Sequence, residues 1–289
     1  MSDPAIETRD LTLRYAGGAG IDSVGLSVER GEIFGFLGEN GAGKTTTIRI
    51  VLDLLRPDRG EARVLGVPVR SGGGELRRRI GFLPGELEFP AGLTGEGALA
   101  LFAALQRRPA PRRDEILDRL GFPRHALRRP VKHYSTGMRQ MIGIACAMQH
   151  DPELLLLDEP TTGLDPLVRD RVLTLLREAR ARGQTVFLSS HVLDEVERLC
   201  DRVAIIHRGT LRRVATVAEL RFAGRRRVTL RFADGRLESF ESDEEAPALL
   251  ARLRAVADGG ALQDVEIRAG ALDEIFRAIV AADAHGAAP

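Results

Sequence analysis

The fold of this 289-residue chain is decided by the stretch Ile33-Phe34-Gly35-Phe36-Leu37-Gly38-Glu39-Asn40-Gly41-Ala42-Gly43-Lys44-Thr45. It opens with an apolar run that is typical of a strand buried on both faces. The rest of it fits the pattern G-x-x-x-x-G-K-[ST], and a helical stretch over 45–55 follows before Pro57 stops it. A strand, a glycine-rich loop and a helix in this order predict a phosphate-binding loop.

The predicted loop suits the phosphates of a nucleotide. Glycines let backbone N–H groups turn toward phosphate oxygens, and the start of the helix adds its positive dipole end. We expect Lys44 to neutralise the β- and γ-phosphates and the Thr45 hydroxyl to bind Mg²⁺. Asn40 is the only asparagine in the chain, so the Asn-Lys-x-Asp reader of guanine nucleotides is absent and an ordinary GTPase is excluded. The expected nucleotide contacts in the loop are Gly38, Glu39, Asn40, Gly41, Ala42, Gly43, Lys44, Thr45 and Thr46.

A second apolar run, Leu154-Leu155-Leu156-Leu157, ends in Asp158 and Glu159. It predicts a buried strand that delivers two carboxylates at its C-terminal end, where open α/β sheets bind ligands. We expect Asp158 to hold Mg²⁺, directly or through water. Glu159 is the candidate general base that orients and polarises an attacking water.

The remaining pattern predicts an α/β chain with two domains. Two short antiparallel strands are expected between residues 5 and 29, a helical insert at about 86–134, and a small α+β domain at 220–289 built around the turn signal Asp234-Gly235. Strands that alternate with helices from 33 to 206 predict a parallel core sheet, so the first domain is expected to cover 5–219. The expected helices are 96–106, 113–120, 135–150, 166–182, 192–199, 245–256 and 272–282, and the further strands are 185–189, 202–206, 228–232, 237–241 and 265–268.

Composition narrows the class of protein. The chain has 42 Lys and Arg against 41 Asp and Glu, and this balance argues against a dedicated nucleic-acid binder. The start of the chain is polar and shows no signal peptide, and no apolar stretch approaches the roughly 20 residues that span a bilayer. Two cysteines, Cys146 and Cys200, are too few for a disulfide scaffold and are expected to be reduced thiols of a cytosolic protein.

A third motif, Tyr134-Ser135-Thr136-Gly137-Met138-Arg139-Gln140, opens the helix that precedes the Asp158 strand. A hydroxyl and a glycine at a helix start offer a second anion site. One nucleotide needs one phosphate cradle, so a second cradle in the chain suggests that a partner uses it. Taken alone, Ser135 is better explained as an ordinary N-cap.

These motifs together resemble the ATP-binding-cassette (ABC) family, specifically the ATPase subunits of drug exporters. The segment that opens with Tyr134-Ser135 looks like the family's signature motif, and Gly163-Leu164-Asp165 looks like its dimer-facing loop. Ser189-Ser190-His191 resembles its switch histidine, and Tyr15 stands where the family stacks an aromatic ring on adenine. Taken alone, Tyr15 could be a strand-edge aromatic and His191 a surface histidine near an N-cap. The resemblance runs from about residue 6 to 216.

The resemblance implies a P-loop cassette that binds ATP and Mg²⁺ and hydrolyses ATP with Glu159 and His191. It implies that Ser135 and Gly137 cap the nucleotide of a partner protomer, which is a second copy or a paralogue. A separate membrane permease is expected as the second partner, for export of drugs or other hydrophobic small molecules. The chain would then lie peripherally on the cytoplasmic face of the cell membrane, with no nucleic acid bound. Two alternatives are a soluble ABC-type ATPase acting on ribosomes or DNA, and a regulatory module that holds ATP without cleaving it.

Two departures from the family pattern stand out. The signature has Thr136 and Met138 where the commonest version has Gly and Gln, but the phosphate-facing Ser135 and Gly137 are kept. Many relatives place a glutamine that contacts Mg²⁺ and water where this chain has Gly85. Two alternatives remain for that contact: Glu86 substitutes for the glutamine, or the contact is missing.

Overall fold

The structure is a computed structural model, which describes residues 3–223, 226–242, 246–258, 262–268 and 276. The expected helix at 272–282 therefore lies outside the described residues, apart from Phe276. Contacts divide the chain into two compact units, Met1–Val214 and Ala215–Pro289. Each unit is described by itself below.

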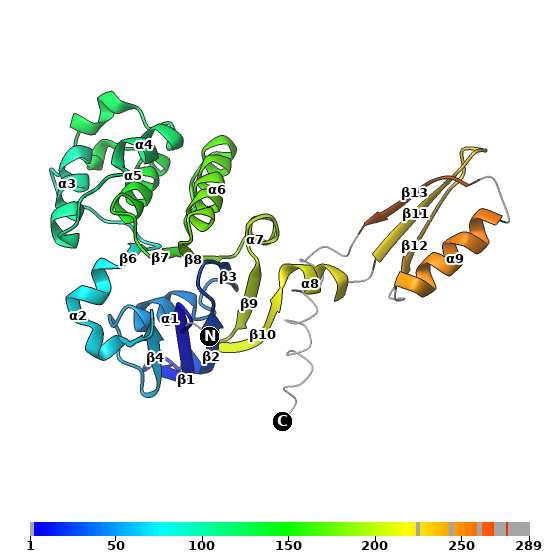
Figure 1. Ribbon diagram of the computed structural model, residues 1–289, viewed down its shortest axis with the longest axis horizontal. Coiled ribbons are helices and arrows are strands. Elements are labelled where there is room, and N and C mark those ends of the chain that lie inside the picture. Colours follow the sequence, from blue (N-terminus) through cyan, green and yellow to red (C-terminus); the bar gives the residue numbers. More distant parts are fainter. Residues whose placement is uncertain (1–2, 224–225, 243–245, 259–261, 269–275, 277–289) are drawn as a thin grey trace. The chain divides into compact units, whose positions relative to one another are not determined.

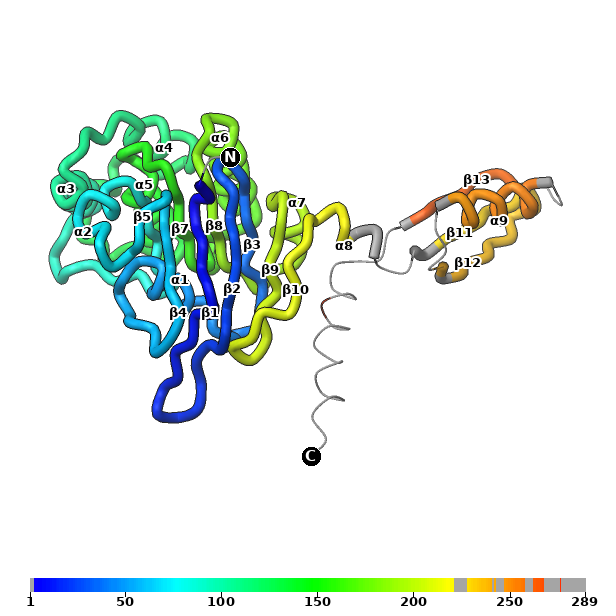
Figure 2. The backbone as a smooth tube through the Cα atoms, turned by 60° about the horizontal axis from the view of Figure 1, so that its bottom comes forward, coloured from blue at the N-terminus to red at the C-terminus, as the bar shows by residue number. Residues whose placement is uncertain are grey.

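A six-stranded sheet with the order β10-β9-β3-β8-β7-β6 forms the centre of the first unit. The pairs β9–β3, β3–β8, β8–β7 and β7–β6 are all parallel, which confirms the predicted parallel core sheet. Figure 2 shows five of these strands, β7, β8, β3, β9 and β10, running side by side through the unit. Their bounds are β3 Ile33–Leu37, β6 Ile80–Leu83, β7 Leu154–Asp158, β8 Thr185–Ser190, β9 Arg202–His207 and β10 Thr210–Thr216.

The central strands are buried along their whole length, as the continuous apolar runs predicted. Every residue of β3, β7 and β8 is buried. Phe34 of β3 stacks on Phe187 of β8 with ring centroids 5.8 Å apart. Because helices cover both faces of such a sheet, the ends of its strands are where polar side chains can gather.

A second, four-stranded sheet has the order β2-β1-β4-β5. Strands β1 and β2 pair antiparallel, as predicted for the N-terminal segment. Strand β4 was not predicted because its sequence RGEARV is mostly polar, and only Ala62 and Val64 of it are buried. It forms a strand because it pairs antiparallel with β1, and no local sequence pattern predicts that pairing. The bounds are β1 Ile6–Arg14, β2 Gly20–Val28, β4 Arg59–Val64 and β5 Val67–Pro68.

Two helices near the phosphate loop differ from expectation. Helix α1 covers Lys44–Val51 and ends short of residue 55 because Asp53 adopts a left-handed φ of 57° and the N–H of Leu54 turns back to the Arg49 carbonyl. Helix α2, Val69–Arg78, was not predicted because it contains three consecutive glycines. Gly73 has a non-helical φ of 52°, so α2 is two short helical pieces joined by a kink.

The predicted helical insert is present. Helices α3 and α4 gather with α5 on one side of the first unit (Figure 1). The side chain of Thr94 caps α3 by accepting a hydrogen bond from the Gly97 N–H, and Gly121 ends α4 in a left-handed conformation. The helix bounds are α3 Gly95–Gln106, α4 Arg113–Leu120, α5 Thr136–Met148, α6 Pro166–Ala181 and α7 Leu193–Leu199, with short 3₁₀ helices at Arg124–Arg128 and Val131–His133.

The second unit contains helix α8, a three-stranded sheet with the order β12-β11-β13, and helix α9. Both strand pairs are antiparallel, and β11 and β12 form the hairpin predicted at Asp234-Gly235. Its own core joins strand and helix residues, including Val228 and Leu249. The bounds are α8 Val217–Ala223, β11 Arg226–Phe232, β12 Leu237–Ser242, α9 Ala246–Asp258 and β13 Leu262–Arg268.

Candidate active site

The phosphate loop joins the end of β3 to the start of α1. Gly43 caps the helix with φ 107°, and a Cβ there would lie 2.6 Å from Ile21 Cγ2, so only glycine fits without strain. Lys44 is 5% exposed, and its Nζ donates to the carbonyls of Gly38 at 2.6 Å and Glu39 at 3.1 Å. The lysine charge is therefore held inside the loop, under the position where phosphates are expected.

Asp158 ends β7 directly opposite the loop and is 2% exposed. One of its carboxylate oxygens, Oδ2, accepts a hydrogen bond from Thr45 Oγ1 at 2.7 Å. The other, Oδ1, accepts a hydrogen bond from Ser189 Oγ. The two residues expected to bind Mg²⁺, Thr45 and Asp158, are thus brought into contact across a sequence separation of 113 residues.

Glu159 lies at the meeting point of three segments. Its Oε1 is 3.4 Å from Lys44 Nζ and 3.2 Å from His191 Nδ1, and its Oε2 accepts a hydrogen bond from Thr162 Oγ1 at 3.2 Å. Its backbone has a left-handed φ of 51°, a costly conformation for a residue with a side chain. The Glu159 N–H donates to Ser189 Oγ at 3.0 Å, which helps to hold that conformation.

The surroundings of Glu159 keep its carboxyl ionised. Burial raises the pKa of Glu159, but the hydrogen bond and charge of His191, the charge of Lys44 and the hydroxyl of Thr162 together outweigh burial. The pKa therefore lies below its usual range. A carboxylate that is ionised at neutral pH and next to a phosphate loop can accept a proton from water.

Two cavities adjoin these groups. One, of about 230 Å³, is lined by the loop together with Tyr15, Gly20 and Glu159. Tyr15 is 42% exposed, and its hydroxyl lies 3.4 Å from Thr46 Oγ1. The other cavity, also about 230 Å³, is lined by Thr45, Arg49, Phe82, Gly85, Glu86, Asp158 and Glu159, among others. Tyr15 therefore lies beside the phosphate loop. The second cavity extends the site toward Gly85.

Gly85 stands against Asp158. A Cβ built on Gly85 would lie 3.2 Å from Asp158 Oδ2, which is tighter than ordinary contact. Glu86 is exposed and lines the same cavity. The chain therefore presents the Glu86 carboxylate near the wall where the family resemblance led us to expect a glutamine.

Ser135 and Gly137 are not brought into this site. Ser135 is exposed and caps α5, with its Oγ accepting from the Met138 N–H at 3.2 Å. Neither residue is among those that line the two cavities at the loop. Within one chain, the described structure gives Ser135 the geometry of an N-cap.

Two site residues were quoted in motifs without a role. Ser189 is fully buried and bonds both Asp158 and the Glu159 N–H, so it sets the positions of both carboxylates. Gln140 of α5 donates from Nε2 to the carbonyls of Glu159 at 3.3 Å and Pro160 at 3.0 Å. The available signal was a polar residue directly next to the apolar, buried run of each element: Ser189 follows the run 186–188 and Gln140 precedes the run 141–148.

Comparison with known proteins agrees with this geometry. Residues 21–162 match the protein family described as "ABC transporter". The bacitracin transport ATP-binding protein BcrA of Bacillus licheniformis is 42% identical over 210 residues, which are 71% of this chain and 68% of that protein. The daunorubicin resistance ATP-binding protein DrrA3 of Streptomyces coeruleorubidus is 35% identical over 303 residues, covering 96% of each. The chain belongs to the ABC transporter family.

Solved structures support the same assignment. An ATP-binding subunit of an ABC transporter is 32% identical, with a TM-score of 0.69 over 75% of this chain and 92% of that one. A dimeric ATP-binding cassette bound to ADP and Pi is 21% identical with a TM-score of 0.64, and shares the fold. The predicted P-loop cassette fold is confirmed, and so is the prediction that this chain is an ABC ATPase, a subunit that binds and hydrolyses ATP.

Proposed function

We propose that this ATPase powers a separate membrane permease that exports drugs or other hydrophobic small molecules. The observation that carries the catalytic part is the convergence of Lys44 and His191 on Glu159, whose Oε1 lies 3.4 Å from Lys44 Nζ and 3.2 Å from His191 Nδ1. The export part is supported by relatives whose names refer to bacitracin transport and to daunorubicin resistance. Among the described residues, no helix is long and apolar enough to cross a membrane.

Nucleotide binding is assigned to the loop and Tyr15. The half-exposed ring of Tyr15 offers a stacking face for adenine beside the loop cavity. The α1 N-terminus and the residues Gly38 to Thr46 receive the phosphates. Lys44, whose amine is buried and bound to loop carbonyls, supplies the positive charge for the β- and γ-phosphates.

The residues present also fit a magnesium ion. Mg²⁺ prefers oxygen ligands, usually one or two carboxylates or hydroxyls together with phosphates and water. Thr45 Oγ1 and Asp158 Oδ2 form such an oxygen pair at the loop, 2.7 Å apart. When bound, the ion would neutralise charge on the phosphates, and Thr45 and Asp158 would hold it.

Glu159 and His191 are assigned to hydrolysis. Glu159 accepts a proton from the attacking water, a role that its lowered pKa permits at neutral pH. His191, whose side chain is 44% exposed, lies 3.2 Å from the Glu159 carboxylate and is assigned to orient it and to contact the γ-phosphate. Ser189 and Gln140 hold the backbone that carries Glu159.

The second cradle is assigned to a partner protomer. Ser135 and Gly137 lie at an exposed helix start, away from the cavities of their own chain. We assign them to the γ-phosphate of a nucleotide held by a second copy or a paralogue. Closure of two cassettes around ATP would complete the site and move the helical insert against the permease, on the cytoplasmic face of the membrane.

The test of the catalytic assignment is the variant Glu159→Gln. We expect it to bind ATP with unchanged affinity and to lose turnover by at least about 100-fold, the usual scale for a general base. The matched control is Glu153→Gln, just before the same strand, where the carboxylate pairs with Arg79 instead. Wild-type turnover by Glu159→Gln would overturn the assignment.

The test of the transport assignment is purification of the tagged chain from the membrane fraction of its native host. Recovery of a polytopic membrane protein is the expected result, and its identity would narrow the substrate. Recovery of ribosomes or DNA-repair proteins with no membrane protein would contradict the transporter assignment and leave the ATPase standing.

A further inference from the structure

The first unit contains a buried carboxylate outside the nucleotide site, on Glu195 of α7. Glu195 is 3% exposed, and its Oε2 accepts a hydrogen bond from Thr161 Oγ1 at 2.6 Å. Its Oε1 lies 3.2 Å from Arg169 Nε of α6, at an angle outside hydrogen-bond geometry. Burying a carboxylate costs free energy that apolar residues of similar size would not, so its presence calls for a reason other than packing.

Glu195, Thr161 and Arg169 form a group of contacting side chains, which we call the Glu195 cluster, and its position in the fold supplies that reason. Thr161 follows Glu159 by two residues, and Glu195 follows His191 by four. The segment after β7 and the segment after β8 are therefore joined twice. One link is the 3.2 Å contact between Glu159 and His191, and the other is the buried bond between Thr161 and Glu195.

Thr161 transmits its position directly to its neighbours. The Thr162 N–H donates to the Glu159 carbonyl, and the Leu164 N–H donates to the Thr161 carbonyl at 3.2 Å, so the segment is a connected series of turns. The Thr161 side chain is 6% exposed, which leaves it little freedom to find another acceptor. A shift of Thr161 would move Glu159 with it.

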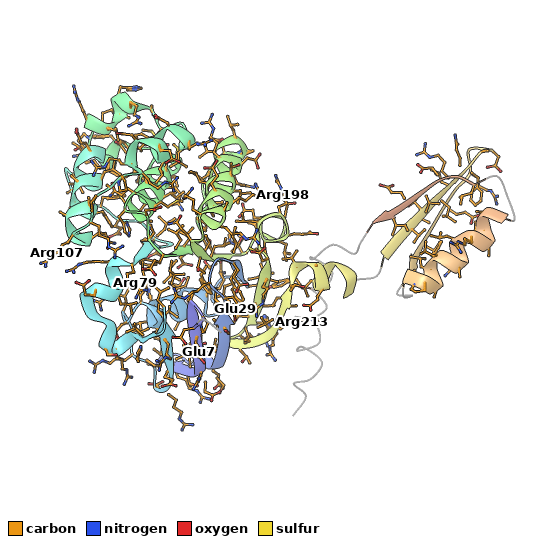
Figure 3. All side chains as sticks on the ribbon, viewed as in Figure 1. Glu7, Glu29, Arg79, Arg107, Arg198 and Arg213 are labelled. Carbon is orange, nitrogen blue, oxygen red and sulfur yellow. The ribbon has the colours of Figure 1, made fainter. Side chains whose placement is uncertain are left out.

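Helix α7 is a firm support for the other end of the link. Arg198 of α7, labelled in Figure 3, lies 3.3 Å from Asp170 of α6, and Arg177 Nη2 donates to the Arg198 carbonyl at 3.2 Å. Val196 of the same helix is fully buried. The helix that carries Glu195 is thus tied to α6, and α6 also supplies Arg169.

We propose that Glu195 is a positioning residue for ATP hydrolysis, which sets the spacing between Glu159 and His191 by holding Thr161 against α7. Arg169 orients its second oxygen. The link acts on turnover and leaves ATP binding alone, because neither Thr161 nor Glu195 lines the cavities at the phosphate loop. This inference rests on the proposed roles of Glu159 and His191.

The test uses the full-length chain and three variants. Thr161→Val keeps the shape and removes the donor, Thr161→Ser keeps the donor, and Glu195→Gln keeps an acceptor for it. We expect Thr161→Val to lower kcat about tenfold, equivalent to about 1.4 kcal/mol, with KM for ATP unchanged. Thr161→Ser and Glu195→Gln should stay close to wild-type kcat. If Thr161→Val does not fold, Glu195→Met removes the acceptor instead and should show the same loss.

The split between kcat and KM, together with rescue by Thr161→Ser, separates positioning from simple stability. A wild-type kcat for Thr161→Val, or an equal loss of kcat in Thr161→Ser, would overturn the inference. If instead Glu159→Gln turns over like wild type, the proposed function itself has failed.

Discussion

Ser189 offers a sharp test of how the site is held together. Its hydroxyl is fully buried, donates to Asp158 Oδ1, and accepts from the Glu159 N–H at 3.0 Å. A bond to a carboxylate contributes about 1.5–3 kcal/mol and a neutral bond about 0.5–1.5 kcal/mol. Ser189→Ala removes both bonds and leaves only a small void.

We expect a loss of stability in the lower part of the combined range for these two bonds. The Glu159 N–H keeps a second acceptor, the Ser189 carbonyl at 3.3 Å, and Asp158 keeps its bond from Thr45. We therefore expect unfolding to become easier by about 2–3 kcal/mol. At about 2–4 °C per kcal/mol for a domain of this size, the thermal midpoint should fall by about 4–12 °C.

The same variant should slow hydrolysis because the Asp158 carboxylate and the Glu159 backbone each lose a fixed partner. If the whole loss of about 2–3 kcal/mol is felt in the transition state, kcat falls by about 30- to 160-fold, since each tenfold step corresponds to about 1.36 kcal/mol. The matched control is Ser190→Ala, because the Ser190 hydroxyl bonds the Val192 backbone and neither carboxylate. Thermal scanning and phosphate release measure the two effects. A variant Ser189→Ala that matches wild type in both would refute this account of the site.

Three further outcomes are expected. Because the pKa of Glu159 lies below its unfolded value of 4.5, its contribution to stability is present above that pH and is lost as pH falls through the lower folded pKa. Glu159→Gln should therefore make the unfolding free energy depend less on pH in the acid range. Urea titrations at several pH values measure this dependence. Burial raises the pKa of Cys146 to about 12 and also raises that of Cys200, so neither thiol should react with a disulfide reagent at neutral pH until urea unfolds the chain. Tyr134→Phe removes the 2.6 Å bond from the buried hydroxyl to the Ala126 carbonyl, which keeps its bond from the Arg129 N–H, and should lower the unfolding free energy by about 0.5–1.5 kcal/mol, whereas an unchanged thermal midpoint would contradict that bond.

Much of the fold could be predicted because its signals are local. The apolar runs of β3, β7 and β8 are too continuous for a half-exposed strand, and all three proved fully buried. Helices α3 and α4 were predicted almost to the residue, because apolar periodicity and flanking prolines mark them. Strand β4 and helix α2 were missed, because a polar strand and a run of glycines carry no such mark.

The same distinction between local patterns and distant contacts applies to the residues of the candidate site. The phosphate loop, the carboxylates Asp158 and Glu159, and the switch histidine His191 each lie in a short motif, so side-chain type and local pattern are enough to propose their chemistry. Ser189, Gln140 and the Glu195 cluster were given no role. Their roles depend on contacts between residues that are distant in the sequence. Ser189 and Asp158 are separated by 31 residues, and Thr161 and Glu195 by 34.

The sequence by itself determined the family, the nucleotide-binding loop and the residues that carry the chemistry, because each of these is encoded within a few consecutive positions. Only the tertiary structure decided which groups meet: Thr45 with Asp158, Lys44 and His191 with Glu159, and Ser189 with the Asp158 carboxylate and the Glu159 N–H. The physical reason is that strand order in the parallel sheet sets these contacts. Neighbouring strands bring their C-terminal ends together wherever the intervening chain runs, and no local pattern records which strands become neighbours.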